Sequence, residues 1–220
     1  MKRYRQACPL ARALDVVGDR WSLLVIRELM LGPRRYSDLL DGLPGIGTNV
    51  LADRLRTLHD HAIVTKRTLP PPAAATVYEL TEAGRDLGPS LAALRRWGTR
   101  HAPLSEPDYA KRPAWTLISA TTSTITLPPV GTCELRAGHE AFRLTGTDNG
   151  LTVRGGPADD PDVTITLETE TLYKITAGHL TVQDAVGQAL IEGDRDIATG
   201  FLSALHGTLA TQPDGRAGLT

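Results

Sequence analysis

The chain has 220 residues, of which 41% are hydrophobic and 22% charged, with a net charge of −1; this composition excludes a disordered or fibrous protein. The length allows one large domain or two domains of ordinary size. No apolar run approaches the roughly 18 residues of a membrane-spanning helix, and the N-terminus leads into no apolar signal segment, so we expect a cytoplasmic protein without a membrane partner.

Charge is unevenly distributed along the chain. Residues 1–102 carry 16 Lys and Arg against 10 Asp and Glu, whereas residues 103–220 carry 8 against 15. A basic part joined to an acidic part indicates that only the first part meets a polyanion such as a nucleic acid. Chance clustering of charge is the alternative, which the motifs have to exclude.

The first part of the chain has the periodicity of helices. Apolar residues at helical spacing predict four helices, which cover residues 9–17, 21–31, 36–41 and 49–61. The fourth helix follows a glycine-rich turn over residues 44–47, with Thr48 as its candidate N-cap. Its apolar side chains fall on one face, and the opposite face consists of Asn49, Ala52, Asp53 and Arg56.

Two β-rich runs follow at residues 63–69 and 76–80, and the proline-rich loop between them predicts a hairpin with a stiff tip. A closing helix is predicted from Thr81 through Trp97. Helices, hairpin and closing helix in this order predict a winged helix-turn-helix. A solvated surface helix is the alternative for residues 49–61, but the order of the elements favours a helix that enters the DNA major groove.

The same part of the chain contains motifs at residues 8–24, 27–29, 32–39, 43–46, 51–55 and 78–84. In order and spacing they resemble the HxlR family of bacterial regulators, which are homodimeric winged-helix proteins related to MarR regulators. The resemblance implies sequence-specific binding to double-stranded DNA at a palindromic operator, usually for repression. Half-sites about 34 to 36 Å apart would follow from the two-fold axis of the dimer.

The resemblance also implies which side chains contact DNA. Base edges and nearby phosphates would be met from the outward face of the fourth helix by Thr48, Asn49, Asp53 and Arg56. Contacts to phosphates would come from Arg34, Arg35, Tyr36 and Arg54. Lys66 and Arg67 lie on the wing, whose tip at residues 70–75 carries no charge, although a basic tip is common in such wings.

Cys8 stands near the start of the first helix, where several proteins of the resembling family carry a cysteine that senses oxidants or electrophiles. The helix dipole and nearby Arg5 and Arg12 would favour its thiolate. Alternatively, Cys8 packs at a dimer interface as a small apolar group. Neither Cys8 nor Cys133 has metal-ligand spacing, and no catalytic set of residues is present, so we predict no metal, no cofactor and no enzyme activity.

The second part of the chain changes to short β-like runs that alternate apolar and polar residues. Strands are predicted at residues 132–136, 141–145, 151–154 and 163–167, and helices at 170–177, 182–190 and 197–205, with a strand-like run at 190–194. An antiparallel sheet with one buried face, covered by helices, follows from this order.

Residues 162–167, 172–178, 184–185 and 191–194 resemble the sterol carrier protein type 2 fold. That fold encloses an apolar tunnel between sheet and helices, which implies an apolar small-molecule ligand. The candidate lining residues are Phe142, Leu172, Ile175, Val186, Leu190, Phe201 and Leu205. The alternative is that the apolar residues of this part close an ordinary core without a cavity.

These patterns predict an α+β protein of two domains. Residues 1–102 form the winged helix-turn-helix DNA-binding and dimerisation domain, 103–113 a linker, 114–212 the sterol-carrier-like ligand-binding domain and 213–220 a tail. The function expected is that of a homodimeric transcription regulator whose DNA binding responds to an apolar small molecule. The alternative is a lipid or isoprenoid carrier whose winged-helix part serves only for dimerisation.

Overall fold

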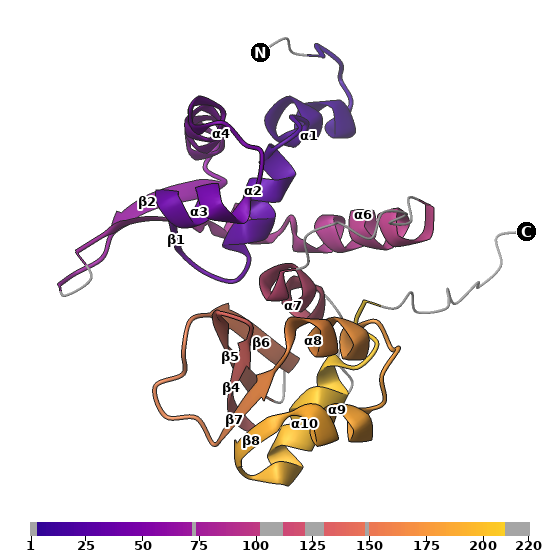
Figure 1. The fold of residues 1–220 in the computed structure, drawn as a ribbon. Coiled ribbons are helices and arrows are strands. Elements are labelled where there is room, and N and C mark those ends of the chain that lie inside the picture. Colours follow the sequence, from indigo (N-terminus) through magenta and orange to yellow (C-terminus); the bar gives the residue numbers. More distant parts are fainter. Residues whose placement is uncertain (1–3, 72–73, 102–111, 122–129, 148–149, 210–220) are drawn as a thin grey trace, which may run out of the picture. The chain divides into compact units, whose positions relative to one another are not determined.

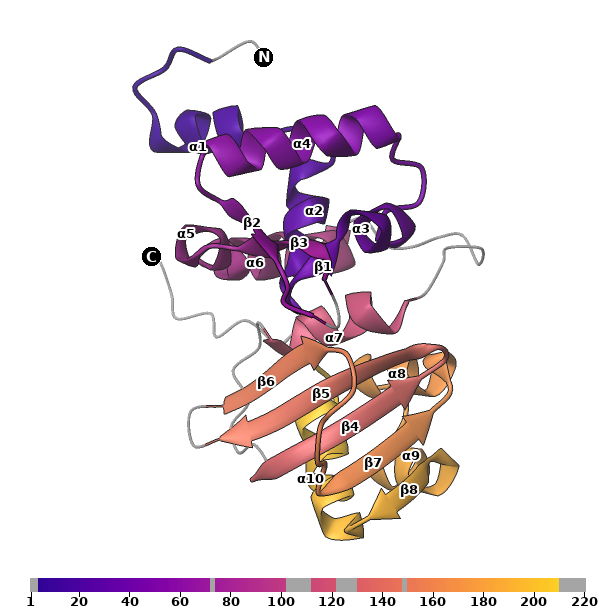
Figure 2. The same ribbon diagram turned by 90° about the vertical axis from the view of Figure 1, so that its left-hand side faces the viewer.

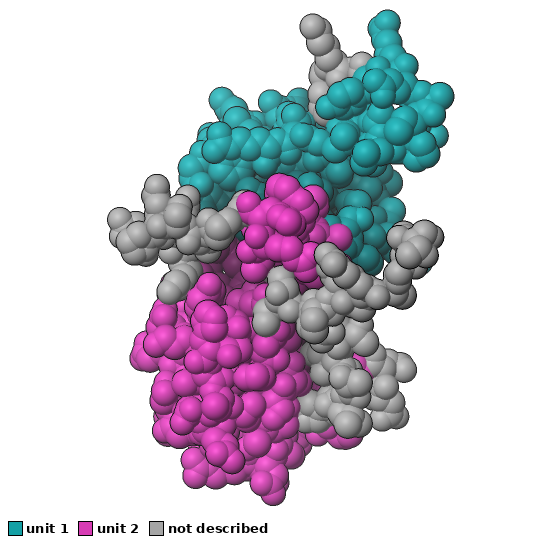
Figure 3. Space-filling model, turned by 90° about the vertical axis from the view of Figure 1, so that its right-hand side faces the viewer, with its two compact units in different colours: residues 1–91 teal, residues 92–220 magenta. Residues whose placement is uncertain are grey.

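The computed structural model describes residues 4–71, 74–101, 112–121, 130–147 and 150–209 (Figure 1). The chain divides into two compact units, residues 1–91 and residues 92–220, which Figure 3 distinguishes by colour. Most of the predicted linker and all of the predicted tail lie outside the described residues.

Unit 1 has the predicted helices and hairpin. Its elements are α1 (Pro9–Val17), α2 (Ser22–Leu29), β1 (Arg34–Arg35), α3 (Tyr36–Gly42), α4 (Thr48–Asp60), β2 (Val64–Thr68), β3 (Thr76–Leu80) and α5 (Glu82–Arg85). Two features differ from prediction. β1 is an additional strand that pairs antiparallel with β3, and the single closing helix is interrupted between α5 and α6 (Gly88–His101). Residues 92–101 of α6 belong to unit 2.

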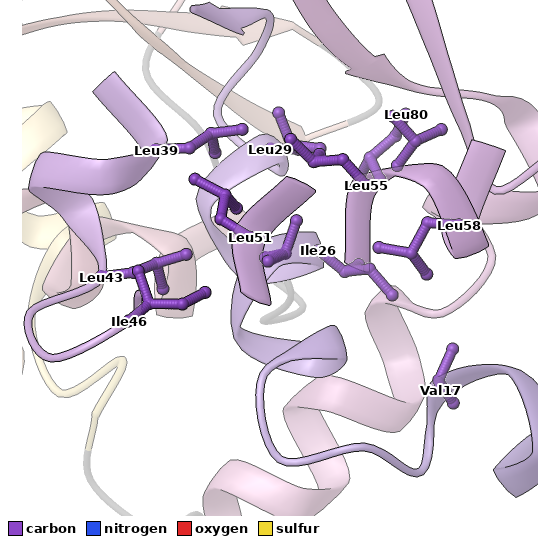
Figure 4. Close-up of a cluster of buried hydrophobic side chains, with 12 residues drawn as sticks. Val17, Ile26, Leu29, Leu39, Leu43, Ile46, Leu51, Leu55, Leu58 and Leu80 are labelled. Atoms are coloured by element: carbon purple, nitrogen blue, oxygen red, sulfur yellow. The ribbon is translucent and has the colours of Figure 1, made fainter. Parts of the chain in front are cut away.

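The core of unit 1 is built around α4 (Figure 4). Leu51, Leu55 and Leu58 of α4 recur at helical spacing and are at most 2% exposed. They belong to one cluster of buried side chains with Ile26 and Leu29 of α2. Because this stripe lies in the core, the rotation of α4 about its axis is fixed, and its polar stripe points outward.

The C-terminus of α4 is closed by a Schellman motif. The amide of Ile63 donates to the carbonyl of Leu58 over 2.9 Å, and the amide of Ala62 donates to the carbonyl of His59 over 2.9 Å. This geometry requires a left-handed backbone conformation at position 62, and Ala62 accordingly has a φ of 55°. Glycine adopts that conformation without the steric cost that alanine pays.

Ala62→Gly should therefore raise the free energy of unfolding by about 0.5 to 1 kcal/mol, because relief of the left-handed strain exceeds the added backbone entropy of the unfolded chain. The matched control is Ala52→Gly, at an exposed position inside α4. This variant should lower the free energy of unfolding by about 1 kcal/mol. Urea denaturation followed by circular dichroism measures both. Destabilisation by both variants would contradict the strain at Ala62.

Unit 2 is a five-stranded sheet with helices. Its elements are α7 (Pro113–Thr121), β4 (Gly131–Ala137), β5 (Glu140–Thr147), β6 (Gly150–Gly155), β7 (Val163–Leu167), α8 (Thr169–Thr176), α9 (Val182–Gln188), β8 (Leu190–Gly193) and α10 (Arg195–Leu205). The strand order is β6-β5-β4-β7-β8. α7 was not predicted, and it begins at the last residue of the predicted linker.

The prediction of an antiparallel sheet was wrong in one respect: β4 and β7 pair in parallel. β4, β5 and β6 form an antiparallel meander, after which the chain crosses back through residues 156–162 and enters the sheet on the other side of β4. Strand alternation is the same in parallel and antiparallel pairs, so the sequence pattern alone could not give this direction.

Helices α8, α9 and α10 lie on one face of the sheet, as Figure 2 shows. α7 contacts β6, and α10 contacts β4, β7 and β8. Side chains that point to this face are buried, including Cys133 and Leu135 of β4, whereas Arg136, which alternates with them, is exposed. This arrangement confirms the prediction of a sheet with one buried face covered by helices.

Glu134 on β4 and its partner Thr164 on β7 are exceptions on the other face of the sheet, because these residues are only 4% and 8% exposed. The Glu134 carboxylate accepts hydrogen bonds from the amide of Ala158 over 2.8 Å and from Arg136 Nε over 2.6 Å. Arg143 donates to the carbonyl of Pro157 over 2.9 Å and to Asp159 over 2.7 Å. These bonds fasten the crossing segment 156–162 to the sheet.

Burial opposes ionisation of Glu134, but the Ala158 amide and the Arg136 guanidinium outweigh burial and lower the pKa of its carboxyl. A lowered pKa means that the ionised carboxylate stabilises the folded unit above the ordinary glutamate pKa of about 4.3. This contribution is lost as the pH falls through the lower pKa of the folded state.

Glu134→Gln should reduce the free energy of unfolding by about 1 to 3 kcal/mol near pH 7, because hydrogen bonds to a charged acceptor are replaced by neutral ones. The difference from the unsubstituted chain should shrink as the pH falls from about 4.3. Denaturant titrations across this pH range measure it. The control is Glu192→Gln, at an exposed position of β8. A loss that is equal at every pH would contradict the role of the ionised carboxylate.

Candidate nucleic-acid interface

α3 and α4 form the helix-turn-helix of unit 1. The turn between them contains Gly45, whose φ of 87° suits only glycine, and the amide of Ile46 donates to the carbonyl of Leu43 over 3.1 Å. α4 then presents its polar stripe, because its apolar stripe is buried. Exposed positions of α4 include Thr48, Asn49, Ala52, Asp53, Arg56 and Asp60.

The predicted base-reading residues therefore share one outward surface. At about 1.5 Å per residue, the stripe from Asn49 to Asp60 extends along roughly 16 Å of the helix. Within it, Asp53 and Arg56 form an ion pair one turn apart, with side chains 55% and 66% exposed. The Thr57 hydroxyl donates to the carbonyl of Asp53 over 3.0 Å. The stripe offers both donors and acceptors to a facing ligand.

Arg54 lies apart from this stripe. Its side chain is 19% exposed and forms an ion pair with Asp19, which lies between α1 and α2. Arg54 thus holds α4 to the preceding helices, a positioning role that the sequence prediction of a phosphate contact missed. The signal was its place in the helix: it follows Leu51 by three residues and precedes Leu58 by four, on the core-facing side.

Tyr36 likewise has a partner within the protein. Its hydroxyl donates to the carbonyl of Thr48 over 2.7 Å and so ties the first residue of α3 to the first residue of α4. The side chain is half-buried and packs against the core of unit 1. This bond fixes the entry of α4, where the predicted base-reading residues begin.

Tyr36→Phe removes only the hydroxyl and should lower the free energy of unfolding by about 0.5 to 1.5 kcal/mol, since one intramolecular hydrogen bond is lost. Tyr78→Phe is the matched control, because Tyr78 packs on the same core and its hydroxyl forms no hydrogen bond to the described residues. Hydrogen exchange of the Leu51 amide, which donates to the carbonyl of Gly47 over 3.0 Å at the start of α4, should accelerate only in Tyr36→Phe. Equal exchange in the two variants would contradict the anchoring role.

Cations flank α4 on β1 and on the hairpin. Arg34 is half-buried, Arg35 is exposed, and neither they nor the exposed Lys66 form an ion pair within the part of the chain that the structure describes. Arg67 differs, because its guanidinium contacts the carboxylate of Glu79 across the hairpin over 3.1 and 3.2 Å. Among the described residues, the predicted DNA-contacting cations Arg34, Arg35 and Lys66 have no ionic partner, whereas Arg67 has one.

The two cysteines have different surroundings. Cys8 is half-buried at the N-cap of α1, and its carbonyl accepts the amide of Arg12 over 3.0 Å. Its role as a redox sensor stays a prediction. Burial, assisted by the neighbouring Glu134, raises the pKa of Cys133 to about 12, so that thiol remains protonated at neutral pH.

The candidate ligand-lining residues of unit 2 fall into two groups. Those that lie almost fully buried are Phe142, Leu172, Ile175, Phe201 and Leu205. Val186 is half-buried, and Leu190 is 63% exposed opposite Thr166, on the sheet face that the helices do not cover. Leu190 is therefore not brought together with the other six.

Among the residues that the structure describes, no group of three or more His, Cys, Asp or Glu side chains could hold a metal ion. No helix that the structure describes is long and apolar enough to cross a membrane.

Comparison with known proteins places the likeness in the basic part of the chain. The family HxlR-like helix-turn-helix matches residues 16–106. The HTH-type transcriptional regulator sll1512 of Synechocystis sp. is 40% identical over 92 residues, which are 42% of this chain and 68% of that protein. Rv3095 of Mycobacterium tuberculosis, also an HTH-type transcriptional regulator by name, is 38% identical over 97 residues, which span 44% of this chain and 61% of that protein.

A third relative has solved structures. The HTH-type transcriptional regulator YodB of Bacillus subtilis is 34% identical over 91 residues, covering 41% of this chain and 81% of YodB. The solved structure of its reduced form aligns over 46% of this chain and 100% of the chain in that structure, with a TM-score of 0.40 and 30% identity.

Proposed function

The chain belongs to the HxlR-like helix-turn-helix family of transcription regulators, and from this premise we propose that it is a homodimeric repressor that binds a palindromic operator in double-stranded DNA. The observation that carries the proposal is the orientation of α4, which buries its apolar stripe and exposes its polar stripe. A helix whose apolar stripe is fixed in a core, and whose opposite stripe carries Asn49, Asp53 and Arg56, suits insertion into the major groove, which is about 12 Å wide.

The roles of the cations follow from their surroundings. Arg34, Arg35 and Lys66 have no ionic partner among the described residues. A DNA phosphate can therefore pair with these side chains without the loss of an internal ion pair. Arg67 would have to exchange Glu79 for a phosphate. Arg54 and Tyr36 contribute by holding α4 in place, in addition to any contact of their own.

We propose that α1 and α6, each considered by itself, contribute to dimerisation. Both helices expose large apolar side chains, with Leu10 of α1 at 67%, Leu94 of α6 at 53% and Trp97 at 60%. Exposed apolar side chains of this size mark surfaces that associate. In a two-fold dimer, the two copies of α4 would meet half-sites about 34 to 36 Å apart.

We assign effector binding to the second part of the chain. The proposed division is residues 1–102 for DNA binding and dimerisation, 103–113 for the linker, 114–212 for an apolar small molecule bound in a sterol-carrier-like domain, and 213–220 for the tail. The proposal rests on the resemblance to the sterol carrier fold, and the side chains between sheet and helices, including Phe142 and Phe201, have the apolar character that such a ligand needs. By linkage, the ligand must bind the DNA-free arrangement more tightly than the DNA-bound one to relieve repression.

The deciding experiment measures binding of the purified chain to promoter DNA beside its own gene across a series of salt concentrations. Nanomolar, sequence-selective binding that weakens steeply with salt is expected, because phosphate contacts release counterions. Weak binding that is indifferent to sequence would overturn the DNA role. For the effector, an apolar compound that binds the protein without changing operator affinity would overturn the proposed coupling.

Arg35→Ala should weaken operator and unrelated DNA by a similar factor and should reduce the slope of log K against log salt by about 1 per protomer, because one phosphate contact is lost. The matched control is Arg85→Ala on α5, an exposed arginine outside the helix-turn-helix and the hairpin. Fluorescence anisotropy at several salt concentrations measures both variants. An unchanged slope in Arg35→Ala would contradict the phosphate contact.

A further inference from the structure

The ion pair between Asp53 and Arg56 stands in the middle of the outward stripe of α4. Its side chains are 55% and 66% exposed, so water surrounds most of both groups. The recorded contact joins Arg56 Nη2 to Asp53 Oδ1 and leaves the remaining N–H donors of the guanidinium outside this pair.

Helix stability does not account for Asp53. An exposed pair of this spacing stabilises a helix only slightly, and Asp53 is the sixth residue of α4, beyond the first turn in which the helix dipole favours a carboxylate. DNA affinity does not account for it either. A carboxylate on the surface that faces DNA repels phosphates, so a neutral residue there would bind any DNA more tightly.

Orientation of Arg56 is the effect that remains. A free arginine side chain on a helix surface samples many rotamers, and binding has to restrict them. The Asp53 carboxylate restricts them beforehand, one turn away on the same face. Arginine reads guanine through two parallel hydrogen bonds to O6 and N7, which requires a correctly aimed guanidinium. Ala52, beside the pair on the stripe, adds no long side chain that would block this approach.

We propose that Asp53 is a specificity-determining positioning residue, which holds the Arg56 guanidinium for bidentate contact with a guanine in the major groove of each half-site and lowers affinity for all other DNA by its charge. This inference rests on the proposed DNA-binding function and deepens it. It predicts opposite effects of one substitution on specificity and on general affinity.

The experiment selects binding sequences from a random pool of DNA duplexes with the unsubstituted full-length chain and its variants Asp53→Asn, Asp53→Ala and Arg56→Ala, and then measures affinities for the selected sequence and for unrelated DNA at one salt concentration. The unsubstituted chain should prefer one guanine per half-site by a factor in affinity on the order of 10-fold to 100-fold, and Arg56→Ala should lose this preference. Both Asp53 variants should lose most of that preference while binding unrelated DNA more tightly.

Asp60→Asn is the matched control. It removes the same charge from the same stripe, but the Asp60 carboxylate lies beside His59, at 4.0 Å, and among the described residues forms no ion pair with Arg56. This variant should tighten binding to every sequence alike and keep the guanine preference. Circular dichroism checks that each variant keeps its helix content, and Asp53→Asn retains the shape of the side chain if Asp53→Ala unfolds.

The outcomes separate this inference from the function on which it rests. If the unsubstituted chain enriches no sequence, the proposed function fails. If it enriches a guanine-containing site whose preference survives in Arg56→Ala, the assignment of Arg56 is overturned. If Arg56→Ala loses the preference but both Asp53 variants keep it, Asp53 does not position Arg56.

Discussion

Burial of one face of α4 against α2 is the interaction on which the surface of unit 1 depends. Leu51, Leu55 and Leu58 are almost wholly removed from water, and each such side chain contributes roughly 1.5 to 3 kcal/mol. Rotation of α4 by one residue, about 100°, would expose these leucines and draw polar side chains into the core. The outward stripe is therefore set by the residues on the opposite side of the helix.

The elements that the sequence pattern predicted are those whose signal is local. Helical spacing located α1 to α4, and alternation located the strands of unit 2 and their buried face, because both depend on spacing within one segment. α7 was missed because its described side chains, at residues 113–118, are almost all buried, so this segment has little amphipathic contrast. β1 was missed because two residues carry no period, and the direction of β7 because it depends on the path of the crossing segment.

The partners of side chains in the candidate site could not be predicted, because the type of a charged residue does not reveal a partner that is distant in the chain. Arg54 and Asp19 are 35 residues apart in the chain, and only the fold brings them together. The same holds for Tyr36 and the carbonyl of Thr48. The arginines predicted to contact phosphates therefore differ. Arg54 holds α4 in place, whereas Arg34 and Arg35 have no ionic partner among the described residues.

The parallel pairing of β4 with β7 has a consequence for the kinetics of folding. Cys133 lies opposite Val163, so the chain must close a loop of about 30 residues before the centre of the sheet can form. In unit 1, the hairpin of β2 and β3 joins segments that are near neighbours in the chain. Contacts of low sequence separation form faster, so the β2–β3 hairpin should form before the β4–β7 pair, whereas the β1–β3 pair, whose partners Arg34 and Tyr78 are 44 residues apart, also has to close a long loop.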